Sequence, residues 1–139
     1  MNLFTPEQAE TAFYRAFERA ELTAMMGVWA EDEEIVCVHP GGERLVGFAA
    51  VRESWRRLFS QGPRLRFQLL DRRVRTVRPM SMHTLYESIT LGGDVGPAHL
   101  ALVTNIYLLT PAGWRMLLHH ASPLPPGATA RDTPAGTIH

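Results

Sequence analysis

The chain has 139 residues, of which 45% are hydrophobic and 20% are charged, and its formal net charge is zero. That length fits one domain with a core of its own, and the composition excludes a disordered chain. A nucleic-acid binder usually carries a basic excess and a membrane helix needs about 20 apolar residues, and the sequence has neither. We therefore expect no nucleic-acid or membrane partner and, since no signal peptide is visible, a cytoplasmic protein.

Charge is unevenly distributed along the chain. Residues 1–60 hold ten acids and six arginines, a balance of −4, whereas residues 61–139 hold four acids and eight arginines, a balance of +4. Complementary halves predict ion pairing within the domain or between subunits.

The first predicted helix begins at Thr5. Thr5 can cap it, Pro6 suits its first position, and Gln8 completes a capping box. Alanines and phenylalanines then recur at helical spacing up to Ala20. The opposite, solvated face is predicted to carry Glu7, Glu10, Arg15, Glu18 and Arg19. A shorter helical segment is predicted over Thr23–Trp29.

A short strand, a turn and a second long helix are predicted next. The segment Glu34–His39 is short and β-branched, which is typical of a strand. Pro40-Gly41-Gly42 ends it as a turn, and Glu43–Val46 is predicted to return as a partner strand. The helix is predicted over about Ala49–Ser60, with Trp55 on its apolar stripe.

The remaining chain reads as antiparallel sheet. Strands are predicted over about Leu65–Val77, Met82–Leu91, His99–Leu109 and Trp114–Ala121, joined by short connections. Alternation breaks at Asp71-Arg72-Arg73, which predicts a bulge or bend. Helices followed by long strands predict an α+β fold in a single domain over residues 1–122. Residues 123–139, rich in Pro and Gly, are predicted to be a flexible tail.

Two segments together carry a family resemblance. One is Val38-His39-Pro40-Gly41-Gly42, followed by Leu45-Val46-Gly47 and a helix with Trp55. The other is Gly113-Trp114-Arg115-Met116-Leu117-Leu118-His119-His120-Ala121-Ser122. Over roughly residues 5–122 the chain resembles the SnoaL-like branch of the nuclear transport factor 2-like superfamily. That branch includes small bacterial proteins and is similar to the association domain of calcium/calmodulin-dependent kinase.

The resemblance implies a cone-shaped α+β barrel, in which a strongly bent, mixed, mostly antiparallel sheet packs on the N-terminal helices. It also implies an open mouth leading to an internal pocket, and a homodimer formed through the outer sheet face. The superfamily includes isomerases, epoxide hydrolases, cyclases, dehydratases and non-catalytic binding or assembly domains, so the fold does not select a reaction. The chain matches neither the isomerase motif nor the Asp-Arg-Asp pattern of the epoxide hydrolases. Both departures argue against a catalytic function.

The residues themselves also favour a dimer. Arginines alternate along the first long strand at Arg64, Arg66, Arg73 and Arg75, and both faces of the last strands look apolar. Helices can cover only one face of such a sheet, and a partner sheet is the economical cover for the other.

Strand alternation selects the first pocket candidates. Odd positions of His99–Leu109 mix polar and apolar side chains, so this face is the better pocket lining, and Asn105 and Tyr107 are the ligand-binding candidates. The alternatives are that Asn105 holds a backbone kink and that Tyr107 lies on the sheet surface. On the preceding predicted strand, Glu87 shares a face with His83 and is expected to point inward.

The last strand supplies the one catalytic candidate. Alternation places Trp114, Met116, Leu118, His120 and Ser122 on one face. By the family pattern His120 and Ser122 face the cavity, with His120 as an acid–base group and Ser122 as a ligand contact. The alternative is a core histidine bonded to a carbonyl. A buried Glu87 beside His120 would form a proton-transfer pair.

The remaining ligand-binding candidates are a rim histidine and three aromatic side chains. His39 matches the family's position at the pocket rim, or else it bonds the backbone of the turn. Trp29 and Trp55 wall the cavity, or else belong to the plain core. Tyr14 is expected to point its hydroxyl inward.

Neither a metal nor a cofactor is expected. His119 and His120 are adjacent on a strand, so their side chains diverge, and Cys37 reads as an inert core thiol. Three hypotheses follow. The first is a pocket protein that binds an apolar or aromatic small molecule. The second is a cofactor-free isomerase, cyclase or dehydratase that uses His120. The third is a dimerisation or assembly domain with a vestigial cavity.

Overall fold

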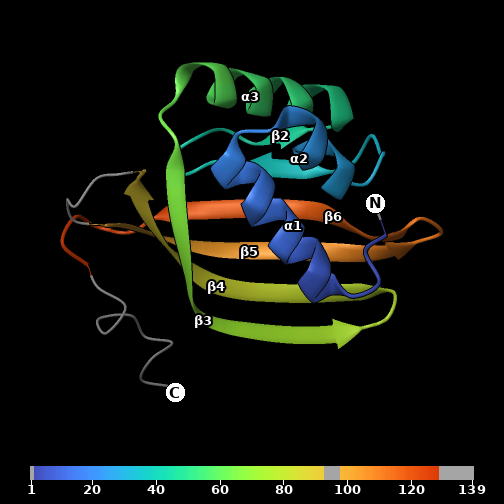
Figure 1. The fold of residues 1–139 in the computed structure, drawn as a ribbon. Coiled ribbons are helices and arrows are strands. Elements are labelled where there is room, and N and C mark those ends of the chain that lie inside the picture. The colour runs from blue at the N-terminus through green and yellow to red at the C-terminus, as the bar shows by residue number, and fades with distance from the viewer. Residues whose placement is uncertain (1, 93–97, 129–139) are drawn as a thin grey trace.

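Three helices and six strands follow one another in the computed structural model, which describes residues 2–92 and 98–128 (Figure 1). They are α1 (Pro6–Arg19), α2 (Leu22–Val28), β1 (Val36–Val38), β2 (Leu45–Val46), α3 (Phe48–Gln61), β3 (Leu65–Val77), β4 (Met80–Leu91), β5 (His99–Thr110) and β6 (Gly113–Pro123). Each predicted element is present, with ends that differ by up to two residues from the sequence-based bounds. The predicted tail lies mostly outside the described residues.

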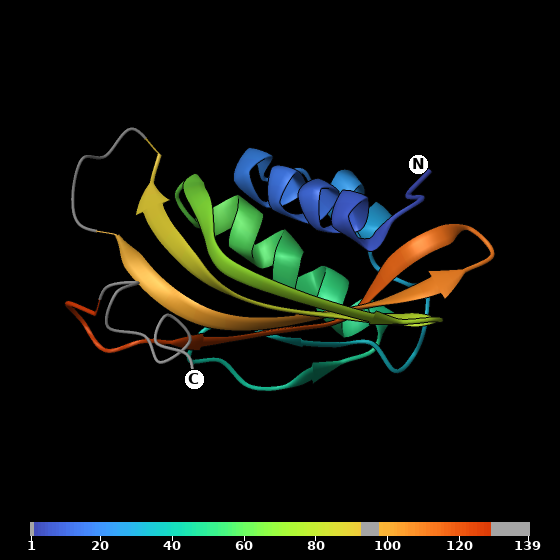
Figure 2. The ribbon, with the colours of Figure 1, turned by 90° about the horizontal axis from the view of Figure 1, so that it is seen from below.

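The six strands form one curved sheet in the order β2-β1-β6-β5-β4-β3. All neighbours are antiparallel except β1 and β6, which run parallel. The helices lie on the concave side, and the other side carries no helix of the described chain (Figures 1 and 2). The predicted α+β class and the bent, mixed sheet are confirmed. The sheet does not close, and β2 and β3 are its edges.

Local chemistry explains where α1 begins and how it packs. The Thr5 side chain accepts a hydrogen bond from the Gln8 backbone at 3.0 Å, and Ala20 ends the helix in the left-handed conformation. Phe13, fully buried, packs edge-on against Trp29 and Trp55 at ring-centre distances of 6.5 and 5.6 Å. These aromatic contacts join all three helices into one core.

Two bulges interrupt the sheet and decide which side chains reach the interior. The β3–β4 register shifts between Leu70 and Arg73, where Asp71 has φ of 48°, so the bulge predicted there is confirmed. The β5–β6 register shifts between Ile106 and Tyr107, and the sequence did not predict this second bulge.

Within the described residues, no helix is both long enough and apolar enough to cross a membrane.

Candidate functional site

A buried carboxylate, Glu10 of α1, is the centre of a polar cluster on the concave face. Its two oxygens accept hydrogen bonds from Arg72 Nε at 2.8 Å, Tyr107 Oη at 2.9 Å and Asn105 Nδ2 at 3.1 Å. His83 Nδ1 lies 3.0 Å from Oε2 of the same carboxylate. Burial pushes the pKa of Glu10 upward, but its contacts with His83, Asn105 and Tyr107 outweigh burial and leave the pKa below its usual value. Glu10 is therefore ionised at neutral pH.

A second carboxylate, Glu87 of β4, is joined to this cluster through Tyr14. The Tyr14 hydroxyl donates to Glu87 Oε2 at 2.6 Å and accepts from Asn105 Nδ2 at 3.2 Å. Burial raises the pKa of Glu87 to about 7, against the opposing effect of the Tyr14 hydrogen bond, and the charge on Glu10 adds to the rise. Burial likewise holds the pKa of Tyr14 well above its usual value. Glu87 is thus close to half-protonated at neutral pH, beside an ionised Glu10.

His119 of β6 extends the cluster on the far side of Asn105. Its Nδ1 lies 2.7 Å from Asn105 Oδ1, and because an amide oxygen only accepts, Nδ1 carries the proton. Burial lowers the pKa of His119 to about 3, so the ring is neutral. It packs against Phe13 with ring centres 4.9 Å apart.

The polar cluster is packed without room for a ligand beside its inner members. Glu10, His83, Glu87, Asn105 and His119 are each at most 1% exposed, and so is Tyr107. None of these groups lines any of the hollows described for residues 2–92 and 98–128. Tyr14, at 6% exposure, is the most accessible of the set.

The structure places six of the predicted site residues in the interior. Trp29, Trp55, Glu87, Asn105 and Tyr107 are buried, and the Tyr14 hydroxyl and Glu87 carboxylate point inward as expected. Their proposed roles toward a ligand stay predictions. Tyr107 is not on the sheet surface, because its hydroxyl donates to Glu10.

His39 lies at the rim, half-buried, with Nε2 at 3.1 Å from Ser54 Oγ. It borders a hollow of about 430 Å³ together with Ser54 and Arg57, and its ring meets Trp55 edge-on at 4.7 Å. Burial lowers the pKa of His39. The alternative in which the His39 side chain bonds the turn is not seen among the described residues, although the His39 carbonyl accepts from the Gly42 N–H at 2.8 Å.

The inward orientation predicted for His120 and Ser122 is wrong, because both are exposed on the outer face of the sheet. The cause is the bulge in β6. Tyr107 pairs with Met116 and Ile106 with Leu118, so Leu117 has no partner and the alternation reverses after it. His119 takes the inward position instead, and the proton-transfer pair expected between Glu87 and His120 does not form.

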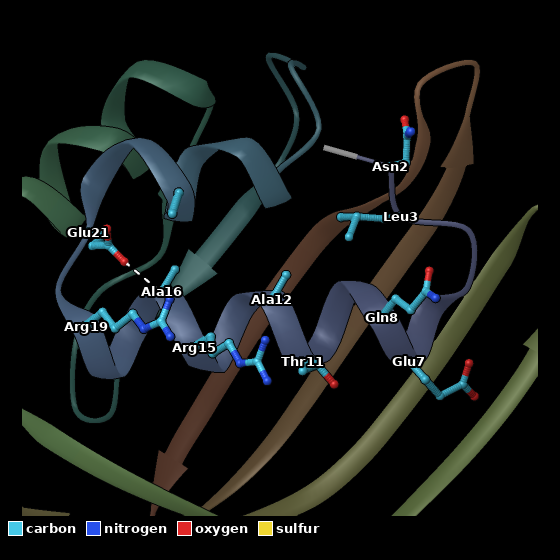
Figure 3. Close-up of a pocket in the computed structure, with 11 residues that line it drawn as sticks. Asn2, Leu3, Glu7, Gln8, Thr11, Ala12, Arg15, Ala16, Arg19 and Glu21 are labelled. Carbon is cyan, nitrogen blue, oxygen red and sulfur yellow. Dashed lines mark ion pairs between the residues drawn. The ribbon is translucent and has the colours of Figure 1, made fainter.

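His39, Asn105 and His120 therefore lie at the rim, in the interior and on the outer face, and do not converge on one hollow. Two hollows larger than the one at His39 lie elsewhere. One of about 530 Å³ runs along the solvent-facing side of α1, on the helical side of the molecule. It extends from Leu3 to the weak Arg19–Glu21 pair at 4.0 Å (Figure 3). Another of about 540 Å³ lies between the end of α2 and the β5–β6 hairpin, with Trp29 in its lining.

Sequence reasoning missed Glu10, Arg72, His83 and His119. The prediction that Glu10 lies on the solvated face of α1 is wrong. Glu10 stands three residues before Phe13 and four before Tyr14, and this spacing places it on the buried face. That spacing was the available signal for Glu10. Nothing in the sequence alone links Arg72 to Glu10, because the bulge that turns Arg72 inward is a feature of the folded sheet.

Comparison with known proteins identifies the family of this chain. A family model for the SnoaL-like domain matches residues 7–126. The chain belongs to this family. Solved structures that are similar to this SnoaL-like domain place it in the nuclear transport factor 2-like superfamily, as the sequence predicted.

One similar structure is a protein from Thiobacillus denitrificans, provisionally described as a calcium/calmodulin-dependent protein kinase type II association domain. It is 40% identical, with a TM-score of 0.84, over 90% of this chain and 99% of that one. Another, from Streptomyces avermitilis, is provisionally described as a dehydratase. It is 31% identical, with a TM-score of 0.78, over 86% of this chain and 93% of that one.

A curated relative is the F-box protein SKIP8 of Arabidopsis thaliana. It is 29% identical over 112 residues, which are 81% of this chain and 46% of the relative. The SnoaL-like domain thus spans about half the length of this plant protein.

The site of this SnoaL-like domain can hold and exchange a proton but shows no metal centre or reactive thiol. Among the described residues, no three His, Cys, Asp or Glu side chains are placed to hold a metal ion. Cys37 is buried, which raises the pKa of its thiol to about 12, even with His39 Nε2 at 3.6 Å. Glu87 is a buried group whose protonation can change near neutral pH.

Proposed function

We propose that this SnoaL-like domain is an association module that forms a homodimer through the outer face of its sheet. The observation that carries the proposal is a set of exposed apolar side chains on the face of the sheet that no helix of the described chain covers. Leu102, Met80, Met82 and Val46 are between 41% and 47% exposed on that side. Exposed apolar groups that are contiguous mark interaction sites.

The apolar groups are contiguous across the sheet. One row of paired positions runs over all six strands, and its members are Val46, Val36, Leu118, Ile106, Met82 and Arg75. Five of the six are hydrocarbon, and the arginine stands at the β3 edge. A second copy of the same face would cover this row, since a two-fold interface is self-complementary. The similarity to a provisionally described association domain supports the same function.

Sedimentation equilibrium tests the proposal. We expect twice the 15.6 kDa chain mass for the wild type at micromolar concentration. Leu102→Arg would bury an unpaired charge between the copies, so we expect it to raise the dimer Kd at least about a hundredfold. Phe4→Arg is the matched control, because Phe4 is 72% exposed in the N-terminal segment, away from this face. A monomeric wild type, or equal effects of the two variants, would contradict the proposal.

A second function is the binding of an apolar or aromatic small molecule beside Tyr14, the most accessible member of the polar cluster, since the inner members leave no room for a ligand. The observation that favours it is the Tyr14–Glu87 pair, since perturbed ionisable groups cluster at functional sites. Acid–base chemistry on such a molecule would then fall to Glu87 and not to the exposed His120. The dehydratase description of the relative from Streptomyces avermitilis supports this alternative.

Thermal unfolding with 1-naphthol, an aromatic alcohol, tests the second function. Binding should raise the melting temperature of the wild type, and Tyr14→Phe should remove that rise by deleting the hydroxyl that meets Glu87. Tyr86→Phe is the matched control, because Tyr86 stands on the opposite face of β4. A rise that survives Tyr14→Phe would place the binding elsewhere.

A further inference from the structure

The two edges of the sheet carry opposite charge. Along β3 and its ends lie Arg64, Arg66, Arg72, Arg73, Arg75 and Arg78 against the single acid Asp71, which is six minus one, or +5. Beside β1 and β2 lie Glu31, Asp32, Glu33, Glu34 and Glu43 against the single base Arg44, which is five minus one, or −4. The acidic run, residues 31–34, is exposed.

The opposite charges lie toward the same end of the strands. Val36 and Arg75 belong to the same row of paired positions across the sheet. The acidic run leads into Val36 on one edge, and Arg75 is followed by Arg78 near the end of β3 on the other edge. Because Arg75 pairs with Met82, which is exposed on the outer face, its side chain is on the outer face as well.

These charges do not neutralise each other within one copy. Four strand spacings separate β1 from β3, which is about 19 Å and too far for an ion pair. In the described part of the chain, neither Arg75 nor Arg78 has a carboxylate within 4.0 Å, and neither Glu33 nor Glu34 has a basic partner. Both groups of charges are therefore available to a second molecule.

We infer that two copies pack outer face to outer face about a two-fold axis parallel to the strands, so that Arg75 and Arg78 of one copy face the acidic run 31–34 of the other. This inference rests on the proposed association. An axis parallel to the strands reverses the strand order and preserves position along the strands, so β3 of one copy meets the β1–β2 edge of its partner at the matching end. An in-plane axis across the strands would instead lay β3 over β3, arginine against arginine.

Charge reversal separates the two arrangements. Arg75→Glu/Arg78→Glu should raise the dimer Kd about tenfold to a hundredfold, because two attractive contacts become repulsive. Glu33→Arg/Glu34→Arg brings the acidic run from −4 to zero, so it removes the attraction without creating repulsion and should raise the Kd by a smaller factor. Mixing the two variants should give a heterodimer with a lower Kd than the Arg75→Glu/Arg78→Glu homodimer, since one contact is then as in the wild type and the other is no longer between like charges. The control is Arg15→Glu/Arg52→Glu, which reverses two exposed charges on α1 and α3, on the helical side.

Sedimentation equilibrium at low and high salt measures each outcome, with circular dichroism to show that every variant is folded. If β3 lies over β3, the strand direction is reversed, so Arg75→Glu/Arg78→Glu places glutamates opposite the arginines at the other end of the second β3. The Kd then falls for this variant and stays unchanged for Glu33→Arg/Glu34→Arg, and the inference is overturned. It is also overturned if the wild type is dimeric and both reversals leave the Kd unchanged, although association itself then stands. A monomeric wild type overturns the association and the orientation together.

Discussion

The two faces of the sheet differ in the polar and apolar groups that they carry. The concave face buries two carboxylates, two histidines, two tyrosine hydroxyls and an amide, whereas the outer face exposes leucine, valine and methionine. Burying an ionised group costs several kcal/mol unless it is paired and hydrogen-bonded. The interior meets that condition through a connected set of hydrogen bonds. On the outer face, no helix of the described chain covers the exposed apolar side chains within one copy.

This contrast separates what each face does for the molecule. The concave network binds α1 to β3, β4 and β5 through Glu10 and Tyr14, so it fixes how the helix crosses the sheet. The outer face makes no such contact with a helix within one copy of the described chain. Substitutions on the concave face should therefore change folding stability, and substitutions on the outer face should change association.

The largest expected effect on stability is that of Glu10→Ala. Removing the carboxylate leaves Arg72, Asn105 and Tyr107 without their common acceptor, and we expect a loss of about 3 to 5 kcal/mol in the free energy of unfolding. Urea denaturation measures the loss. Glu7→Ala, on the exposed face of the same helix, is the control and should cost less than about 0.5 kcal/mol. A loss below about 1 kcal/mol for Glu10→Ala would show that the network does not hold α1.

The next effect depends on pH and isolates Glu87. Its pKa is raised from 4.5 to about 7, so the folded protein holds a proton that the unfolded chain releases at lower pH. The resulting stability is fully present below about pH 4.5 and is lost as the pH rises through 7. We expect the free energy of unfolding of the wild type, relative to Glu87→Gln, to fall by about 2 to 3 kcal/mol across that window.

The difference between the two proteins is the quantity to measure, at one fixed protein concentration. His119 has the opposite sign: its pKa is lowered to about 3, so its contribution is present above about pH 6.5 and is lost toward pH 3. Subtracting the free energy of unfolding of Glu87→Gln from that of the wild type at each pH removes the contribution of His119, because both proteins contain it. A difference that stays flat between pH 4.5 and 8 would mean that Glu87 is ionised in the folded protein.

Much of this fold followed from periodicity and turn chemistry. Alternation correctly placed Glu87, Asn105 and Tyr107 inward, because the paired region of β4 and β5 that carries them is regular. The bulge at Asp71 was also visible, since polar residues interrupt the alternation there. The contacts that assemble the network were not visible, because Glu10 and Tyr107 are 97 residues apart and meet only in the folded sheet.

The last strand shows why the rest could not be predicted. The segment Met116-Leu117-Leu118 is apolar throughout, so nothing in it marks which residue loses its partner. A bulge at Leu117 shifts the parity by one, and a shift of one residue sends every later side chain to the other face. His119 and His120 exchange their expected places for that reason alone.

Paired substitutions of His119 and His120 give the sharpest comparison between the two faces. His119→Ala removes a fully buried ring and leaves Asn105 Oδ1 without its donor, so we expect it to cost about 2 to 3 kcal/mol. His120→Ala removes an exposed side chain and should cost less than about 0.5 kcal/mol. Both are measured by urea denaturation in the Leu102→Arg background, so that association does not contribute. A larger loss for His120→Ala would mean that β6 lacks the bulge at Leu117 and keeps the regular alternation, and equal losses would contradict the buried position of His119.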